Sequence, residues 1–394
     1  MFIILGVVMN SSQKYQTNLK SIFGAFDAFT MWKGRVALYA ILRVLGIGKG
    51  DEVILPGYTC VMDVNPVKYV GANPVYVDIE PDTFNMDVSL LEQAITPNTK
   101  LIIAQHTYGY VCDMDELMGI AEKYGVTVIE DCCLCVGSTY KGKLAGTFGI
   151  ASYFSGQWNK PFTTGIGGMV TCNDENVAQD IQELCENELI KPSFKEVLML
   201  QAQLWVYKAL IYPRTTALAQ NLFRWLTKKG IVVGSSSNEE FEPKMPENFF
   251  KAMSSVQAKE GVKKMKSLEA NIEHRKKMSS FYDELLGNKG WGIRQFDSSK
   301  QDPVMVRYPV RVKDKQKAIE DAAKHGIELG TWFECALHPI ETPLEKYDYE
   351  IGMCPVADKA CEQVVNLPLH TRVSKKTARR TVDFITKYCE EAFA

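Results

Sequence analysis

The chain has 394 residues and a nearly balanced charge, with 45 Lys and Arg against 47 Asp and Glu and a formal net charge of −2. This balance argues against a general nucleic-acid-binding protein, which is normally clearly basic. The length is sufficient for one large domain and a smaller one.

The eleven cysteines are interpreted as reduced thiols of a cytosolic protein, because their number is odd and no secretory signal precedes them. The closest group is Cys132, Cys133 and Cys135. It lacks a second pair of ligands, so we expect small buried side chains beside a strand end and no metal. The apolar residues 1–10 are too short to span a bilayer and predict no element.

Residues 30–175 alternate between helix and strand patterns. The stretch RVALYAILRVLGIGKGDEVILP (35–56) predicts a helix that begins near Val36, stops at glycines and leads into a β-branched strand. The stretch MDELMGIAEKYG (114–125) predicts an amphipathic helix with Gly125 as its C-terminal stop. Further short apolar strands are predicted at PVYVDI (74–79), KLIIAQH (100–106), VTVIED (126–131) and GGMVTC (167–172).

Apolar strands separated by helices predict an α/β fold, in which helices cover both faces of a mostly parallel sheet. Ligands of such sheets gather at the carboxyl ends of the strands. Glu130, Asp131, His106 and the segment around Lys160 lie at these ends or just beyond them.

The second half of the chain predicts a smaller α+β unit. A flexible loop is expected at GSSSNEEFEPKMPEN (234–248), and a long helix follows from residue 254. We predict an N-terminal segment (1–29), a large domain (30–260) with an apolar insert at about 190–235, and a small C-terminal domain (261–394).

One lysine and one aspartate are the candidate catalytic residues. Lys160 lies in the segment FSGQWNKPFTTGIGGMV (154–170), directly before Pro161 and a run of glycines, where a surface helix is not expected. Asp131 follows an apolar strand, where a carboxylate is costly unless it has a cationic partner. The alternatives are a solvated surface lysine and an acid that caps a helix or turn.

Gly34 and Arg35 predict an anion site, because they stand at the start of a helix, where backbone N–H groups are free. Ser155 adds a hydroxyl five residues before the lysine. An aldehyde cofactor with a phosphate and a basic ring nitrogen would use all of these groups. The residues therefore predict pyridoxal phosphate (PLP); the alternative for Arg35 is a salt-bridged surface residue.

The chain resembles the DegT/DnrJ/EryC1/StrS aminotransferases, PLP enzymes of fold type I that mostly aminate keto sugars on nucleotides. The resemblance extends from about residue 30 to the end. It is carried by LGIGKGDEVILPGYT (45–59), GANPVYVDIEPDTFNMD (71–87), HTYGYVCDMDELMGIAEKYGVTVIEDCC (106–133), GSTYKGKLAGTFGIASYFSGQWNKPFTTGIGGMVTCND (137–174) and VVNLPLH (364–370).

The resemblance implies a role for each of these residues. Lys160 is the expected Schiff-base lysine, Asp131 the partner of the pyridine nitrogen, and Ser155 a phosphate ligand. The turn at Gly34 and Arg35 aligns with the phosphate turn of the family. The resemblance also implies a homodimer with shared active sites.

Several cofactor contacts depart from the family pattern. Cys60 stands where the family often has an aromatic ring that stacks on the cofactor, and Tyr58 is the alternative stacking residue. Leu134 replaces a glutamine or histidine expected near the phenolic oxygen of the cofactor. The family's Asn-x-Arg element would fall on Phe250 and Ala252.

Asn248 is the nearest asparagine to that element, although it is out of register. It is the remaining candidate for a contact with the cofactor phosphate of the partner subunit. His106 and His338 are interpreted as packed or hydrogen-bonded structural histidines rather than catalytic groups.

The apolar insert predicts two helices broken at Pro213. One interpretation is a hairpin that packs on the dimer or the other domain. The other is an amphipathic element at 196–229 that approaches a membrane or an acyl substrate, through apolar and basic side chains. These are Leu204, Trp205, Phe223, Trp225, Arg214, Arg224, Lys228 and Lys229.

The sequence therefore predicts a PLP-dependent aminotransferase. It is expected in the cytoplasm, with at most a peripheral association with a membrane. It would move an amino group from an amino-acid donor, expected to be glutamate, to a keto substrate, expected to be a nucleotide-linked keto sugar. The alternatives are a lipid-linked or other unusual ketone as acceptor, a PLP lyase or dehydratase, and a non-catalytic relative that binds the cofactor.

Overall fold

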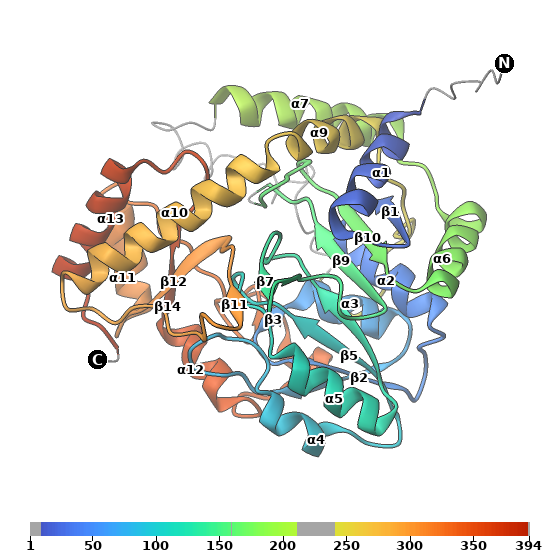
Figure 1. The fold of residues 1–394 in the computed structure, drawn as a ribbon, viewed down its shortest axis with the longest axis horizontal. Helices are drawn as coiled ribbons and strands as arrows, with labels where there is room; N and C mark the ends of the chain where they lie inside the picture. Colours follow the sequence, from blue (N-terminus) through green and yellow to red (C-terminus); the bar gives the residue numbers. More distant parts are fainter. Residues whose placement is uncertain (1–8, 159, 211–240, 393–394) are drawn as a thin grey trace.

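A seven-stranded sheet forms the centre of the molecule in the computed structural model, which describes residues 9–158, 160–210 and 241–392 (Figure 1). The strand order is β1-β10-β9-β6-β5-β2-β4, and β10 runs antiparallel to both neighbours. The remaining strands run parallel, which confirms the predicted α/β class. The bounds are β1 Asp27–Met31, β2 Glu52–Pro56, β4 Asn73–Val77, β5 Thr99–Gln105, β6 Thr127–Asp131, β9 Ala151–Ser155 and β10 Gly168–Cys172.

Helices cover both faces of this sheet, and their buried side chains form two cores. Side chains of α2, α3 and α6 pack in one core, together with much of the C-terminal part of the chain. Side chains of α1, α5 and α9 pack in the other. The bounds are α1 Ser11–Phe23, α2 Gly34–Val44, α3 Val61–Tyr69, η1 Val88–Leu90, α4 Leu91–Ala94, α5 Met114–Tyr124, α6 Glu175–Glu188 and α9 Ser255–Met265.

The structure adds two elements before residue 30 that the sequence did not predict. Helix α1 starts at a capping box formed by Asn10 and Gln13, and it buries only Tyr15, Leu19 and Phe23. Strand β1 then forms one edge of the central sheet by pairing with β10. An otherwise polar helix with three buried residues gives too weak an apolar pattern for prediction.

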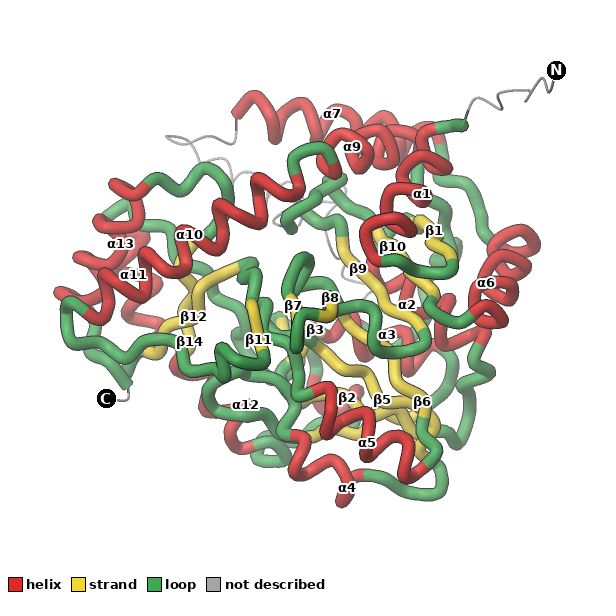
Figure 2. The backbone as a smooth tube through the Cα atoms, viewed as in Figure 1, coloured by secondary structure: helices red, strands yellow, loops and turns green. Residues whose placement is uncertain are grey.

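The C-terminal part packs beside the sheet, at the left in Figures 1 and 2, with the long helix α10 leading into it. Strand β12 pairs antiparallel with β14, and β13 pairs in parallel with β3 of the large part. The predicted boundary after residue 260 falls within α9, and its position stays a prediction. The bounds are β3 Thr59–Cys60, β7 Thr139–Tyr140, β8 Lys143–Leu144, α10 Leu268–Gly287, β11 Gln301–Asp302, β12 Arg307–Arg311, α11 Lys315–Lys324, β13 Leu337–His338, η3 Leu344–Tyr347, α12 Pro355–Gln363, β14 Val364–Pro368 and α13 Lys375–Tyr388.

The described part of the insert is helix α7, Phe194–Leu210, which lies along α9 (Figure 1). Leu200 and Leu204 of α7 are buried against Trp32 and Ile166. In the parts of the chain that the structure describes, no helix is long and apolar enough to cross a membrane. The predicted break at Pro213 lies outside the described residues, as do Arg214, Phe223, Arg224, Trp225, Lys228 and Lys229.

Candidate active site

The carboxyl ends of β6 and β9 bring Asp131 and Ser155 to the same face of the sheet. Asp131 ends β6 and lies opposite Tyr153 of β9 in the strand register. Because side chains alternate along a strand, Tyr153 and Ser155 share a face, and Asp131 shares it with Tyr153. Asp131 is 4% exposed, and its Oδ1 accepts a hydrogen bond from the backbone N–H of Cys133 at 2.8 Å.

Lys160 follows β9 in a loop and is only 9% exposed, so it is not a solvated surface lysine. Its Nζ lies 4.9 Å from the ring centre of Trp332. Burial lowers the pKa of the Lys160 amine, while the neighbouring Cys133, Asp131 and Asp63 oppose this effect. A buried amine with a lowered pKa is a better nucleophile than a solvated lysine.

The N-terminus of α2 approaches Ser155 closely because two glycines permit it. A Cβ atom on Gly34, the first residue of α2, would lie 3.2 Å from the Cβ of Ser155. A Cβ atom on Gly168 would overlap the carbonyl of Lys33, the residue before α2. The N-cap residue makes no side-chain cap hydrogen bond, which suits an anion site at this end of the helix.

Arg35 is buried, so the alternative of a salt-bridged surface residue is wrong. Its positive charge acts on Cys60 and Asp63, which places it on the same side as the lysine. Cys60 is partly buried, and burial raises the pKa of its thiol to about 12, so the thiol is neutral.

Asp63, in the first turn of α3, is a site residue that the sequence did not single out. Its Oδ1 accepts a hydrogen bond from the Tyr153 hydroxyl at 3.1 Å, and its Oδ2 accepts one from Thr59 Oγ1 at 3.4 Å. Burial and the charge of Asp131 raise the pKa of Asp63 to about 8, against the opposing effects of Tyr153 and Lys160. The one available signal was an acid just after a strand end.

Trp332 is a second residue that the sequence did not single out. It comes from the C-terminal part, and its carbonyl accepts a hydrogen bond from Asn366 Nδ2 at 3.0 Å. Two cationic side chains that are far apart in the sequence lie close to its ring, Lys160 at 4.9 Å and Arg307 at 4.5 Å from the ring centre. Only the packing of the two parts of the chain reveals this arrangement.

The insert contacts the loop that carries the lysine. The hydroxyl of Tyr207 in α7 donates to the carbonyl of Trp158 at 3.2 Å, and the two rings lie 4.8 Å apart. A Cβ atom on Gly165 would lie within 3.3 Å of Leu200 and Leu204. Helix α7 therefore packs on the segment that positions Lys160, whatever its outer face contacts.

Two further residues that the sequence predicted to contact the cofactor, Tyr58 and Leu134, are buried in the structure. Tyr58 is fully buried among Phe84, Tyr108 and Phe333, and its hydroxyl lies 2.9 Å from that of Tyr108, so no face of its ring is open to a cofactor in this conformation. Leu134 is buried in the core that includes α2 and α3.

Asn248 is exposed and has a left-handed backbone, with φ of 57°. It stands beside the buried Phe249 at the entry to α9. Because Asn248 is exposed, it is accessible for the predicted contact with a partner subunit, which stays a prediction.

The buried histidine and cysteine cluster does not fit a metal site. The ligand atoms of His106, Cys132 and Cys135 lie within 4.8 Å of one another. However, His106 Nδ1 accepts from the N–H of Cys112 at 3.2 Å, so Nε2 donates to Glu130 at 3.1 Å and no lone pair remains. Burial also raises the pKa of both thiols, which keeps them protonated.

His338 also behaves as a structural residue. It lies in β13, opposite Cys60 in the register with β3, and burial lowers the pKa of its imidazole to about 4. The ring is therefore neutral at physiological pH. Its Nδ1 accepts from the N–H of Glu334 at 3.4 Å.

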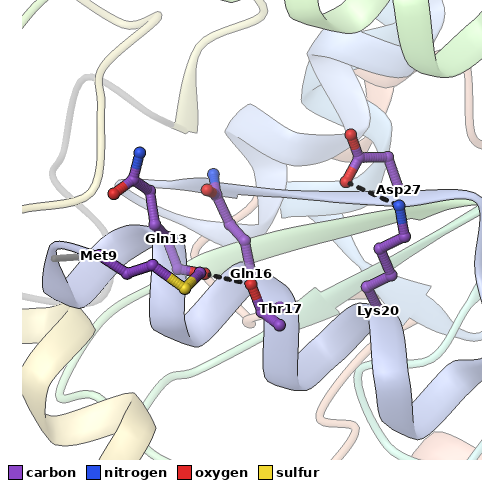
Figure 3. A pocket seen from close by; sticks show the side chains of 6 residues that line it. All are labelled: Met9, Gln13, Gln16, Thr17, Lys20 and Asp27. Carbon is purple, nitrogen blue, oxygen red and sulfur yellow. Dashed lines mark hydrogen bonds and ion pairs between the residues drawn. The ribbon is translucent and has the colours of Figure 1, made fainter. Parts of the chain in front are cut away.

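Two surface pockets lie away from these residues. One of about 260 Å³ lies on α1, where Lys20 and Asp27 approach to 4.0 Å (Figure 3). The other, of about 230 Å³, lies between α7 and α9, where Lys208 pairs with Glu260 at 2.6 Å. None of the predicted cofactor residues lines either pocket.

The arrangement fits pyridoxal phosphate. A buried amine stands near a carboxylate at the end of a strand, and Ser155 lies close to Gly34 at the N-terminus of α2. These are the groups needed to bind an aldehyde, a pyridine nitrogen and a phosphate. The fold and these groups define a PLP-dependent transferase of fold type I.

The chain belongs to the DegT/DnrJ/EryC1/StrS aminotransferase family, whose model matches residues 7–199 and 216–386. The members that give this family its name are aminotransferases. It is similar to GDP-perosamine synthase of Caulobacter vibrioides, with 45% identity over 161 residues, 41% of this chain and 43% of that protein. This match spans less than half of that relative.

A longer match is to UDP-2-acetamido-2-deoxy-3-oxo-D-glucuronate aminotransferase of Pseudomonas aeruginosa, with 30% identity over 90% of this chain and 84% of that protein. Among solved structures, a Streptococcus pneumoniae protein in its PMP form matches 97% of this chain and 92% of its own, at a TM-score of 0.75 and 24% identity. That likeness supports the fold.

Proposed function

We propose that this aminotransferase moves an amino group from an amino acid, with glutamate as the donor, to a keto sugar carried by a nucleotide. The observation that carries the proposal is the buried Lys160 amine beside Asp131 and Asp63, at the carboxyl edge of the sheet. The relatives support the substrate class, since their names describe nucleotide-sugar products or substrates.

Each residue has a proposed task. Pyridoxal phosphate, when bound, supplies a carbonyl group and an electron sink. Lys160 would hold the cofactor through its amine and, when free, would accept and donate a proton at Nζ. Asp131 keeps the ring nitrogen protonated, and the Cys133 N–H bond to Oδ1 fixes the carboxylate for this task.

The phosphate end is proposed to be held by Ser155 Oγ and the start of α2 at Gly34, with the positive charge of Arg35 nearby. Asp63 holds a proton at neutral pH, since its pKa is raised to about 8. A neutral Asp63 limits the negative charge in the site to Asp131, which lets Lys160 lose its own proton more readily.

We also propose that two copies of the chain form a homodimer, with Asn248 directed to the site of the partner. The exposed position of Asn248 and the exposed apolar side chains of α7 support this arrangement. The second candidate role for the insert is peripheral contact with a membrane. Both the dimer contact and the membrane contact would use the outer face of α7.

Single-turnover reactions test the proposed function. The PLP-loaded protein is mixed with L-glutamate, and release of 2-oxoglutarate is followed together with the change in visible absorbance. The product is then offered a panel of nucleotide-linked keto sugars, and re-formation of the aldehyde form identifies the acceptor.

The outcomes separate the alternatives. Stoichiometric release of 2-oxoglutarate followed by amination of a keto sugar supports the proposal. A non-catalytic relative would bind the cofactor without release of keto acid from any amino acid. A lyase or dehydratase would instead release an elimination product from the substrate.

A further inference from the structure

Two arginines in the C-terminal part differ in their hydrogen bonding. Arg275 of α10 makes three hydrogen bonds: Nε donates to Asn271 Oδ1 at 2.8 Å, and Nη1 donates to the carbonyls of Met305 and Val306 at 3.1 and 2.8 Å. Arg307, which begins β12, has its Nε covered from solvent with no hydrogen-bond partner among the described residues.

The Arg307 guanidinium is held in place by its surroundings. Its centre lies 4.5 Å from the ring centre of Trp332, within the range of a cation–π contact. A Cβ atom on Gly330 would overlap Arg307 Nη1, so the glycine makes room for the guanidinium. The side chain as a whole remains partly exposed, which leaves part of it open to a ligand.

The charge of Arg307 is only partly compensated by its surroundings. Burial lowers the pKa of Arg307, and the attraction of Glu328 offsets this only in part. Glu328 is instead hydrogen-bonded by His370 Nε2 at 3.3 Å. A buried charged donor without an acceptor is costly, and a planar carboxylate is the ligand that matches a guanidinium best.

Trp332 links this guanidinium to the reacting amine. The same indole ring lies 4.9 Å from Lys160 Nζ and 4.5 Å from the Arg307 guanidinium. Because both groups are measured to the same ring centre, Lys160 Nζ and the centre of the Arg307 guanidinium lie no more than about 9.4 Å apart. One small molecule can therefore reach both, with its carboxylate at Arg307 and its amino or carbonyl group at Lys160.

We propose that Arg307 binds the carboxylate of a substrate that reacts at Lys160 and so helps to determine substrate specificity. The inference rests on the proposed function, and it names the chemistry of one substrate. Two sources share this chemistry: the α-carboxylate of the amino donor, and the carboxylate of a keto uronic acid acceptor.

The test compares Arg307→Met and Arg307→Lys with the unmodified enzyme in both half-reactions. The donor arm uses L-glutamate and 4-aminobutanoate, which lacks the α-carboxylate. The acceptor arm uses a nucleotide-linked keto uronic acid and the corresponding keto sugar with a neutral CH₂OH group. Arg275→Lys is the matched control, expected to lower stability without changing selectivity.

If Arg307 binds the donor, Arg307→Met raises the half-saturating concentration of L-glutamate roughly 30-fold or more, and that of 4-aminobutanoate hardly changes. If it binds the acceptor, the same loss is seen only with the keto uronic acid. In either case Arg307→Lys restores part of the affinity, since it keeps the charge but not the planar fork. Equal effects on both members of each substrate pair would overturn the proposal.

Binding of L-glutamate and of the keto uronic acid to the cofactor-free protein, measured by calorimetry, gives a second readout. Loss of binding in Arg307→Met supports the proposal even if no amino transfer is found with any acceptor. Unchanged binding of both carboxylates would overturn it, whereas the proposed function would still stand on the half-reactions. If Arg307→Met fails to fold, Arg307→Lys carries the same comparison.

Discussion

The Tyr153 hydroxyl donates a hydrogen bond to Asp63 Oδ1 at 3.1 Å, and this bond ties the first turn of α3 to the carboxyl end of β9. It brings a second carboxyl group into the surroundings of Asp131 and Lys160. The site therefore contains two acids beside one amine, and one of the acids is held neutral near pH 7.

Asp63→Asn is expected to change how stability depends on pH. The pKa of Asp63 is raised to about 8 in the folded protein, whereas an unfolded aspartate has a pKa of about 3.9. The folded protein therefore holds a proton that the unfolded chain has released, and the free energy of unfolding falls as pH rises from about 4 to about 8.

The asparagine removes this titration, so at pH 8 the cofactor-free variant should be the more stable protein, by on the order of 2 kcal/mol. Urea unfolding at several pH values between about 5 and 8 measures the difference. Parallel pH profiles for the two proteins would show that Asp63 does not hold a proton.

Lys160→Ala is expected to abolish covalent attachment of the cofactor while leaving the fold intact. Reduction with borohydride followed by peptide mass mapping should find the cofactor on the peptide with Lys160 in the unmodified protein and nowhere in the variant. A labelled variant would disprove the assignment.

A matched control is Lys315→Met. Lys315 is also buried, with a pKa lowered to about 8, but its Nζ donates to the carbonyls of Phe333 and Cys361 at 2.6 and 2.8 Å. This variant should keep the label on Lys160 and lose about 1–3 kcal/mol of stability, because two carbonyls lose their donor.

Asp131→Asn should slow the reaction with L-glutamate by roughly 10²–10⁴-fold, since the amide cannot hold the ring nitrogen protonated. The amide oxygen can still accept the Cys133 N–H, so folding should be retained. Single-turnover rates and thermal unfolding separate the two effects. Near-normal rates would assign the task to another acid, with Asp63 the first to examine.

Gly168→Ala should weaken binding of the phosphate group, because its Cβ would displace the Lys33 carbonyl at the start of α2. We expect the affinity for pyridoxamine phosphate to fall at least about tenfold, and that for pyridoxamine to change little. Gly119→Ala in α5 is the control, since a Cβ atom there has nothing within 4 Å and improves helix propensity. Equal losses for both ligands would disagree with a phosphate site here.

Trp205→Asp tests the predicted homodimer. Trp205 is 71% exposed on α7, about three turns from Phe194 at 83%, and a charge there should weaken an apolar subunit interface at least about tenfold. Analytical ultracentrifugation of both proteins measures the change, with Tyr124→Asp on α5 as an exposed control. A fully active monomer at nanomolar concentration would contradict the prediction.

If the outer face of α7 instead contacts lipid, the dimer is unaffected by Trp205→Asp and the unmodified protein sediments with anionic vesicles at low salt. Weaker vesicle binding of the variant would then favour the membrane interpretation. Absence of vesicle binding in both proteins would remove it.

The sequence by itself determined the class of fold, and it singled out Asp131 and Lys160, both of which are buried in the structure. Uninterrupted apolar strands such as those ending at Asp131 are needed where both faces of a sheet are buried, so their pattern is visible without a structure. Gly125 was identifiable as a helix stop because its φ of 65° is a conformation that few other residues adopt.

Tertiary structure alone decided which side chains surround Lys160. Asp63 and Trp332 come from α3 and from the loop before β13, and Arg307, which contacts Trp332, comes from β12; no local pattern connects them. Helix α1 and the contact of Tyr207 with Trp158 were likewise not predictable, because few of their residues are buried and their partners are distant in sequence. Periodicity reports which face of an element is covered, whereas the identity of the covering residue depends on how the whole chain packs.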